Sequence, residues 1–171
     1  MDRVARGLYL FNMWIGNTDA KDDNSRIYMK KEFGELTAYQ EAHSDLGLSF
    51  GGLFNAGQTQ KFRPGASFLK RTLFGRKLRF SFPIMFKPEA WKFATYSDMR
   101  WMAKKIASLK KSDIEDSVSR SRWAEKTKEE VVKVLMDRRD RIAKFYRVNW
   151  SHALGILNVD YPTHSGVIRA L

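Results

Sequence analysis

The chain of 171 residues contains no cysteine and only three histidines, His43, His152 and His164. The absence of cysteine excludes a disulfide scaffold, a thiolate zinc site and a cysteine nucleophile. The histidines stand at no spacing typical of metal ligands, so a histidine-rich metal site is not expected. The apolar run from Gly7 to Gly16 contains Asn12, is too short to span a bilayer, and lacks a signal-peptide cleavage site. We therefore expect a soluble, cytoplasmic protein without a membrane span.

Acidic residues are scarce in one part of the chain. The sequence has 31 Lys and Arg against 19 Asp and Glu, a formal net charge of +12. Residues 1–60 hold six basic and eight acidic side chains, whereas residues 61–171 hold 25 basic and 11 acidic ones. A basic surface attracts phosphate polyanions, including nucleic acid, but it also simply keeps a protein soluble. The 61–171 segment is thus a candidate nucleic-acid-binding region, although it lacks a helix-turn-helix, zinc-finger or ribonucleoprotein signature.

The length and a hydrophobic content of 43% predict one packed domain, or one lobe of a larger one. Apolar residues at helical spacing predict a helix over 4–14, which Gly16 and Asn17 end. Alternating residues then predict a β-hairpin that turns around Gly34, and a glycine-rich loop follows over 49–65. Strand content is expected largely within 25–50 and 76–82, with predicted strands over 26–30, 36–42 and 76–82.

The second half of the chain has the periodicity of helices. One helix is expected to begin at Ser97 and Asp98, and two more at the capping pairs Ser112 with Glu115 and Thr127 with Glu130. The apolar face of the last helix is expected to contain Val131, Val134, Leu135, Ile142, Phe145 and Tyr146. Its arginines Arg138, Arg139 and Arg141 are expected to face solvent or to pair with Asp137 and Asp140. The tryptophans are expected to be core and subdomain anchors rather than stacking platforms: Trp14, Trp91, Trp101, Trp123 and Trp150.

The polar loop after the first predicted helix contains candidate catalytic and metal-binding residues. Asp19 is followed five residues later by Asn24, and after the hairpin comes Asp45, in Asp45-Leu46-Gly47. Phosphoryl transfer requires a carboxylate facing the acceptor hydroxyl, and an amide oxygen and a second carboxylate that hold Mg²⁺ against the nucleotide phosphates. Hard oxygen ligands suit Mg²⁺ or Mn²⁺. Asp and Asn are also ordinary turn and cap residues at a helix exit, so the order of the elements carries this prediction.

Residues 7–52, with the patterns Asp19-x-Lys21-x-x-Asn24 and Asp45-Leu46-Gly47, resemble the protein-kinase-like superfamily. Asn17-x-Asp19 is closer to its atypical branches, the HipA-type bacterial kinases and the phosphatidylinositol kinases. The block Asn-x-Trp-Ile-Gly-Asn-x-Asp and the pattern Arg-Arg-Asp-x-Ile also resemble a group of uncharacterised bacterial proteins. The kinase resemblance implies ATP as co-substrate, with Asp19 as the base and Lys21 as a phosphate contact. It also implies Asn24 and Asp45 as ligands of Mg²⁺ or Mn²⁺, and a hydroxyl acceptor that stays unidentified.

The resemblance implies an α+β fold, a kinase-like C-terminal lobe over 1–148, and leaves 149–171 as a tail of uncertain packing. That lobe comprises an N-terminal helix, a catalytic loop, a β-hairpin and a mostly helical second half. A kinase also needs an N-terminal lobe with a phosphate-covering loop and a paired lysine, which residues 1–171 do not contain. The chain is then a fragment of a phosphotransferase or a scaffold that has lost catalysis. The alternatives are a basic nucleic-acid-binding module and a non-catalytic, pseudokinase-type interaction domain.

Overall fold

The computed structural model describes residues 3–21, 25–32, 35–43, 49–50, 62, 65, 68–72, 77–81, 84 and 86–148. Within them the fold is mixed α+β and mostly helical, with two small antiparallel sheets. This confirms the α+β class. Most of the predicted 49–65 loop and the tail at 149–171 lie outside the described residues. No helix in the described ranges is long and apolar enough to cross a membrane.

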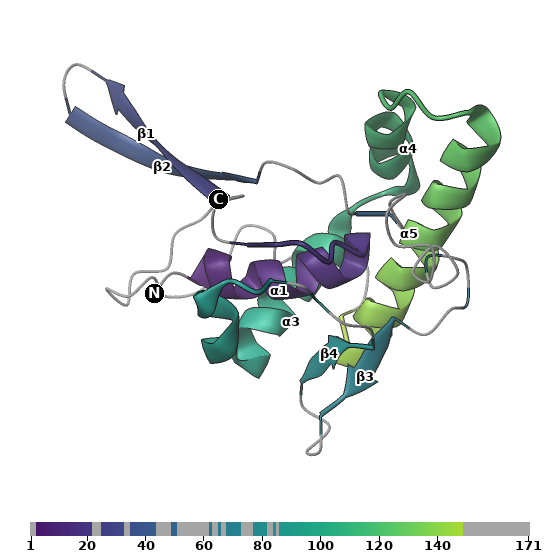
Figure 1. The fold of residues 1–171 in the computed structure, drawn as a ribbon, viewed down its shortest axis with the longest axis horizontal. Coiled ribbons are helices and arrows are strands. Elements are labelled where there is room, and N and C mark those ends of the chain that lie inside the picture. The colour runs from purple at the N-terminus through teal and green to yellow at the C-terminus, as the bar shows by residue number, and fades with distance from the viewer. Residues whose placement is uncertain are drawn as a thin grey trace.

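Helix α1, Arg3–Ile15, forms the centre of the helical body (Figure 1). It buries Leu10, Met13 and Trp14, as the spacing of apolar residues predicts, and packs against α3, α5 and the strand β4. A positive φ of 72° at Gly16 ends the helix, as expected. The location of α1 means that the loop after it begins deep inside the molecule rather than at an exposed end.

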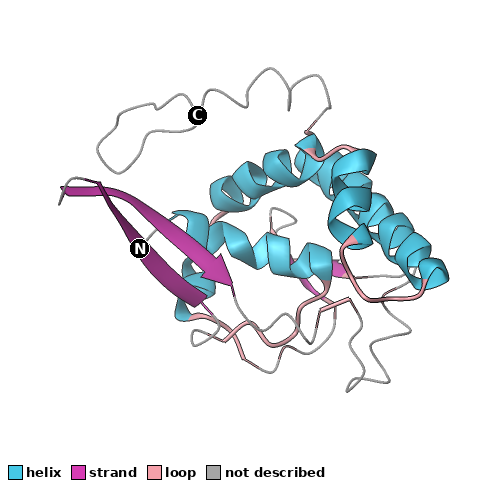
Figure 2. Ribbon diagram, turned by 90° about the horizontal axis from the view of Figure 1, so that it is seen from above, coloured by secondary structure: helices cyan, strands magenta, loops and turns pink. Residues whose placement is uncertain are grey.

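The predicted β-hairpin is confirmed. Strand β1, Ser25–Glu32, pairs antiparallel with β2, Glu35–His43, and the register places Ser25 opposite His43. The hairpin projects away from the helices in both views (Figures 1 and 2). Its open end, at Ser25 and His43, therefore connects to the rest of the chain.

A second sheet lies beside the C-terminal part of α5 (Figure 1). It contains β3, Leu69–Arg71, and β4, Leu78–Phe80, paired antiparallel. The prediction of a strand within 76–82 is confirmed, since Leu78 and Phe80 are buried with Arg79 exposed between them. Strand β3 was not predicted, because its three residues contain a single apolar side chain and show no alternation.

The second half of the chain consists of helices, as predicted, but their starts differ. A 3-10 helix η2, Glu89–Phe93, precedes α3, Tyr96–Ser108, α4, Lys111–Ser119, and α5, Glu125–Tyr146. The predicted capping pairs were wrong, because the helices begin one to three residues earlier than the pattern suggested. In α3 the Thr95 hydroxyl accepts the Asp98 N–H, and in α4 the Asp113 carboxylate accepts the Lys110 N–H.

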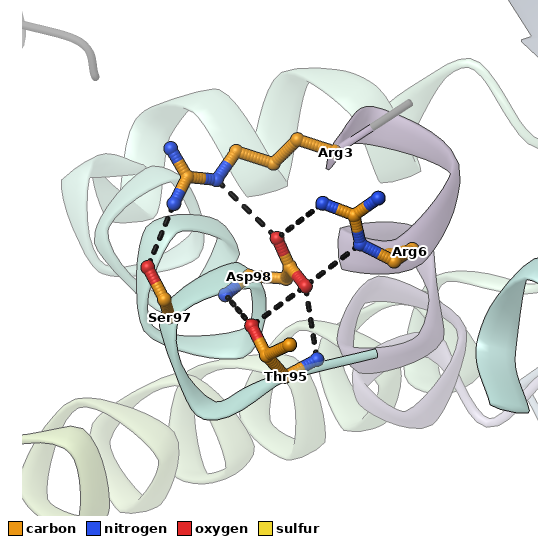
Figure 3. A network of polar contacts seen from close by, with 5 residues as sticks. All are labelled: Arg3, Arg6, Thr95, Ser97 and Asp98. Atoms are coloured by element: carbon orange, nitrogen blue, oxygen red, sulfur yellow. Dashed lines mark hydrogen bonds and ion pairs between the residues drawn. The ribbon is translucent and has the colours of Figure 1, made fainter. Parts of the chain in front are cut away.

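Asp98 joins the first turn of α3 to α1 through a buried ion pair (Figure 3). Its carboxylate accepts hydrogen bonds from Arg6 Nε at 2.8 Å and Nη2 at 3.1 Å, and lies 3.4 Å from Arg3 Nε. The Thr95 N–H and hydroxyl also donate to it, and Arg3 donates to Ser97. Burial alone raises the pKa of Asp98, but the hydrogen bonds and the charge of Arg6 outweigh burial and lower it to about 2. Asp98 thus stays ionised and links residues more than ninety positions apart.

Three of the five tryptophans occupy core positions, as expected. Trp14, Trp91 and Trp101 are each less than a tenth exposed. Trp123 is 38% exposed and packs against Phe50, so it contacts another part of the chain without a core position. Trp150 lies outside the described residues.

Candidate functional site

The loop that carries Asp19 begins at the C-terminal end of α1, where backbone hydrogen bonds close the last turn of the helix. Gly16 N–H bonds to the Met13 carbonyl and Asn17 N–H to the Asn12 carbonyl, the pair of bonds that defines a Schellman motif. Asn17 is buried, and its amide donates to Asn12 Oδ1 at 2.8 Å while its own Oδ1 accepts the Asp19 N–H at 3.1 Å. These bonds fix the backbone from the last turn of α1 as far as Asp19.

Asp19 and Lys21 are the two predicted site residues that the structure describes. The Asp19 backbone forms a parallel bridge with Phe86, and its side chain is 13% exposed. Lys21 Nζ lies 3.8 Å from Asp19 Oδ2, and the Lys21 side chain is 39% exposed. A mostly buried carboxylate beside a more accessible ammonium can accept a proton and attract a phosphate group, respectively.

A backbone contact returns the chain to this loop after the hairpin. The N–H of Phe50, five residues after Asp45 in the sequence, donates to the Ile15 carbonyl at 2.9 Å. Phe50 has a φ of 57°, which is unusual for a bulky residue, and its ring packs edge-on against Phe62 and Trp123. The segment that follows Asp45 is therefore tied to the same helix end from which the Asp19 loop departs.

The other two predicted site residues, Asn24 and Asp45, lie outside the described residues. In sequence, Asn24 directly precedes Ser25, and Asp45 follows His43 by two positions. Ser25 and His43 are partners at the open end of the hairpin. Both residues thus adjoin that end, while the convergence of their side chains with Asp19 stays a prediction.

Arg138 on α5 holds the end of α1 from the other side. Its guanidinium donates to the carbonyls of Trp14 at 3.0 Å and Met13 at 3.3 Å, and lies 4.5 Å from the ring centres of both Phe62 and Phe68. Burial and the nearby charge of Arg141 lower the pKa of Arg138 to about 9, which leaves it protonated at neutral pH. A cation at the C-terminal end of α1 also interacts favourably with the negative end of the helix dipole.

The expectation that the α5 arginines face solvent or pair with Asp137 and Asp140 was wrong for Arg138, whose guanidinium donates to backbone carbonyls in the interior. Arg138 is 1% exposed. Arg139 is also buried and donates to the Leu109 carbonyl, although it pairs with Asp140 as expected. Arg141 pairs with Asp137 at 3.4 Å, as predicted. The helical periodicity contained the signal for Arg138, since it stands three residues after Leu135 and four before Ile142, both buried.

Within the described ranges, no group of three or more His, Cys, Asp or Glu residues could hold a metal ion. A Mg²⁺ site at Asn24 and Asp45 stays a prediction. Asp19 provides a carboxylate of the oxygen-donor type that Mg²⁺ prefers. Comparisons of the chain with protein-family models, curated proteins and solved structures found no match.

Proposed function

We propose that this chain is the catalytic lobe of an ATP- and Mg²⁺-dependent phosphotransferase. The observation that carries the proposal is the hydrogen bond from Phe50 to Ile15, which returns the chain beyond Asp45 to the start of the Asp19 loop. The element order supports it, since a helix, an acidic loop and an antiparallel hairpin precede the second Asp. In sequence, Asn24 and Asp45 flank the open end of that hairpin, and Asp19 follows the C-terminal end of α1.

Each residue has a role that its chemistry allows. Asp19 accepts the proton of the acceptor hydroxyl as that oxygen attacks the γ-phosphorus, and the bond to the β-γ bridging oxygen breaks to release ADP. Lys21 neutralises phosphate charge beside it, which its 3.8 Å distance from the carboxylate and its exposure permit. Asn24 and Asp45 would hold Mg²⁺, which supplies charge stabilisation to the transferring phosphoryl group when it is bound. The buried bonds of Asn17 keep the Asp19 backbone in place without reorganisation.

The proposal includes a second lobe that covers the nucleotide. Without such a cover, water stays in the site and each charge interaction is weaker. We therefore expect residues 1–171 alone to bind Mg²⁺·ATP weakly and to show no measurable phosphate transfer. A longer chain that adds a β-rich lobe with a glycine loop and a paired lysine should transfer phosphate.

The experiment is a nucleotide titration and a phosphate-transfer assay on both lengths of chain. In the longer chain, Asp19→Asn should abolish transfer and leave nucleotide binding nearly intact, whereas Asp45→Asn should weaken both. The exposed Asp140 provides the matched control, Asp140→Asn, which should change neither. Transfer by residues 1–171 alone that is insensitive to Asp19→Asn would contradict the assignment. Nucleotide binding without transfer in the longer chain would support the pseudokinase alternative instead.

A further inference from the structure

A basic hollow of about 530 Å³ lies between the β3–β4 hairpin and the C-terminal turns of α5. None of its lining residues belongs to the Asp19 loop. The floor is apolar and the rim is cationic. We define the basic hollow by its floor residues Leu69, Leu78 and Phe145 and its rim residues Arg71, Arg141, Lys144 and Arg147.

The rim cations come from two elements and are largely uncompensated. Arg71 lies over the Phe145 ring at 5.2 Å, while Arg141 pairs with Asp137. Among the described residues, no carboxylate lies within ion-pair distance of Arg71, Lys144 or Arg147, all three of which are exposed. Like charges held around one hollow repel each other, so an anion bound between them would relieve that repulsion.

The end of α5 holds one of these cations in a defined position. Arg147 has a φ of 52°, and the bonds from Arg147 N–H to Lys144 and from Val148 N–H to Ala143 form a second Schellman motif. A non-glycine residue in the left-handed region costs conformational energy. The rim of the basic hollow is thus built on a helix end and a strand pair rather than on a free loop.

Positive charge continues on the other face of the β3–β4 hairpin. Lys70 stands directly opposite Arg79, and both are exposed. Like charges directly opposite each other destabilise a strand pair. Cations on both faces of one short hairpin fit an extended polyanion better than a single phosphate group.

We infer that the basic hollow binds single-stranded nucleic acid, with phosphates against the rim and a sugar or base over the apolar floor. A membrane surface fits less well, because the floor residue Leu78 is only 3% exposed and is too recessed to enter lipid. One cation, Arg71, lies over the Phe145 ring, and the other cations line the same hollow, a combination of charge and aromatic surface typical of sites for single strands. The hollow then brings four of the basic residues of 61–171 together at one location.

The test is the fluorescence anisotropy of a fluorescein-labelled 20-mer of thymidine, titrated with the full chain between 50 and 200 mM salt. Four phosphate contacts predict a log–log salt slope of about −3. The double variant Lys144→Gln with Arg147→Gln should lower affinity at least tenfold at 50 mM salt and reduce the slope by about 1.4. The single variant Lys144→Gln, on an exposed side chain that leaves the helix end intact, should lose affinity several-fold.

A charge-matched control removes two lysines from another surface. Lys111 and Lys133 line a separate hollow between α4 and α5, and Lys111→Gln with Lys133→Gln should leave affinity within about twofold. Equal losses in both double variants would contradict a localised site, as would stronger binding to vesicles with 20% phosphatidylserine than to the oligonucleotide. Complete competition by 5 mM inorganic phosphate would show that the hollow binds a single phosphate group, and it would contradict binding of an extended strand. Asp19→Asn should not change oligonucleotide binding, which separates this inference from the proposed function.

Discussion

Two buried charged residues hold the ends of α1, and both connect it to later parts of the chain. At one end Asp98 accepts hydrogen bonds from Arg6 and lies close to Arg3. At the other end Arg138 donates to two backbone carbonyls and lies between two phenylalanine rings. Charged groups are buried only when they are paired or hydrogen-bonded. Removal of either residue therefore takes a hydrogen-bond partner away from the groups that it contacts.

Arg138→Met keeps the length of the side chain but removes the guanidinium. We expect it to lower the free energy of unfolding by about 2–3 kcal/mol, because the carbonyls of Met13 and Trp14 lose a buried donor. Urea unfolding followed by tryptophan fluorescence measures the loss. Arg141→Met is the control, since its side chain is 38% exposed and paired with Asp137, and should cost less than about 1 kcal/mol. A loss for Arg138→Met no larger than that for Arg141→Met would contradict a stabilising role of the buried guanidinium.

The stability of the protein should depend on pH through Asp98. Its pKa in the folded state is about 2, below the ordinary 3.8, so the ionised form is favoured by folding. The stabilisation is complete above about pH 5 and is lost as the pH falls through 3.8 towards 2, a change of about 2 kcal/mol. Urea unfolding at pH 6 and pH 2 should show that the difference between the wild type and Asp98→Asn shrinks by this amount. A constant difference would contradict the lowered pKa, and Asp140→Asn serves as the exposed control.

The secondary structure elements follow local patterns where those patterns are strong. The period of apolar residues predicted α1, and alternation with a central glycine predicted the hairpin of β1 and β2. The helix starts were displaced, because Thr95 rather than Ser97 accepts the first-turn N–H of α3. Strand β3 depends on pairing with β4, a tertiary contact that three residues do not encode.

The turn after α1 should be more sensitive to substitution than a comparable turn elsewhere. Gly16 and Gly65 have φ values of 72° and 75°, so alanine is strained at both, by about 1 kcal/mol. A Cβ at Gly16 would also lie 3.1 Å from Arg138 Nη1 and from Phe62, whereas at Gly65 it would meet nothing within 4 Å. We expect Gly16→Ala to lower the free energy of unfolding by about 2–3 kcal/mol and Gly65→Ala by about 1 kcal/mol. A larger loss for Gly65→Ala in urea unfolding would contradict the packing of Arg138 against the turn.

The open end of the hairpin should bring Asn24 and Asp45 together. The chain has no cysteine, so Asn24→Cys with Asp45→Cys introduces one unambiguous pair. We expect a short bismaleimide linker to join the two cysteines. When the chain is then cleaved between residues 24 and 45, the linked fragments should migrate together in denaturing electrophoresis. Glu32→Cys with Asp45→Cys is the control, because Glu32 lies at the far end of β1 and should not be joined. Efficient linkage of the control pair alone would contradict the register-based placement.

At the scale of the whole molecule, the sequence predicted the order of elements and the sign of the surface charge but not the tertiary partners of the charged residues. Arg138 was expected to face solvent or to pair with Asp137 or Asp140, although its helical position is within the apolar stripe. The basic hollow is formed by two elements that are some seventy residues apart in sequence, so no local pattern contains it. Of the candidate site, the Asp19 loop and its link to Phe50 are structural observations, and the metal site at Asn24 and Asp45 is a prediction.

The most direct test of the central claim is the binding of Mn²⁺·ATP, measured by equilibrium dialysis of labelled ATP in the presence of excess Mn²⁺. We expect the wild-type chain to bind with millimolar affinity. Asn24→Ala and Asp45→Asn should each weaken binding at least tenfold because each removes a metal ligand. Asp19→Asn, which removes the proposed base, and the control Asp140→Asn should stay within about twofold of the wild type. Binding that is unchanged in both Asn24→Ala and Asp45→Asn would contradict a phosphotransferase site at this loop.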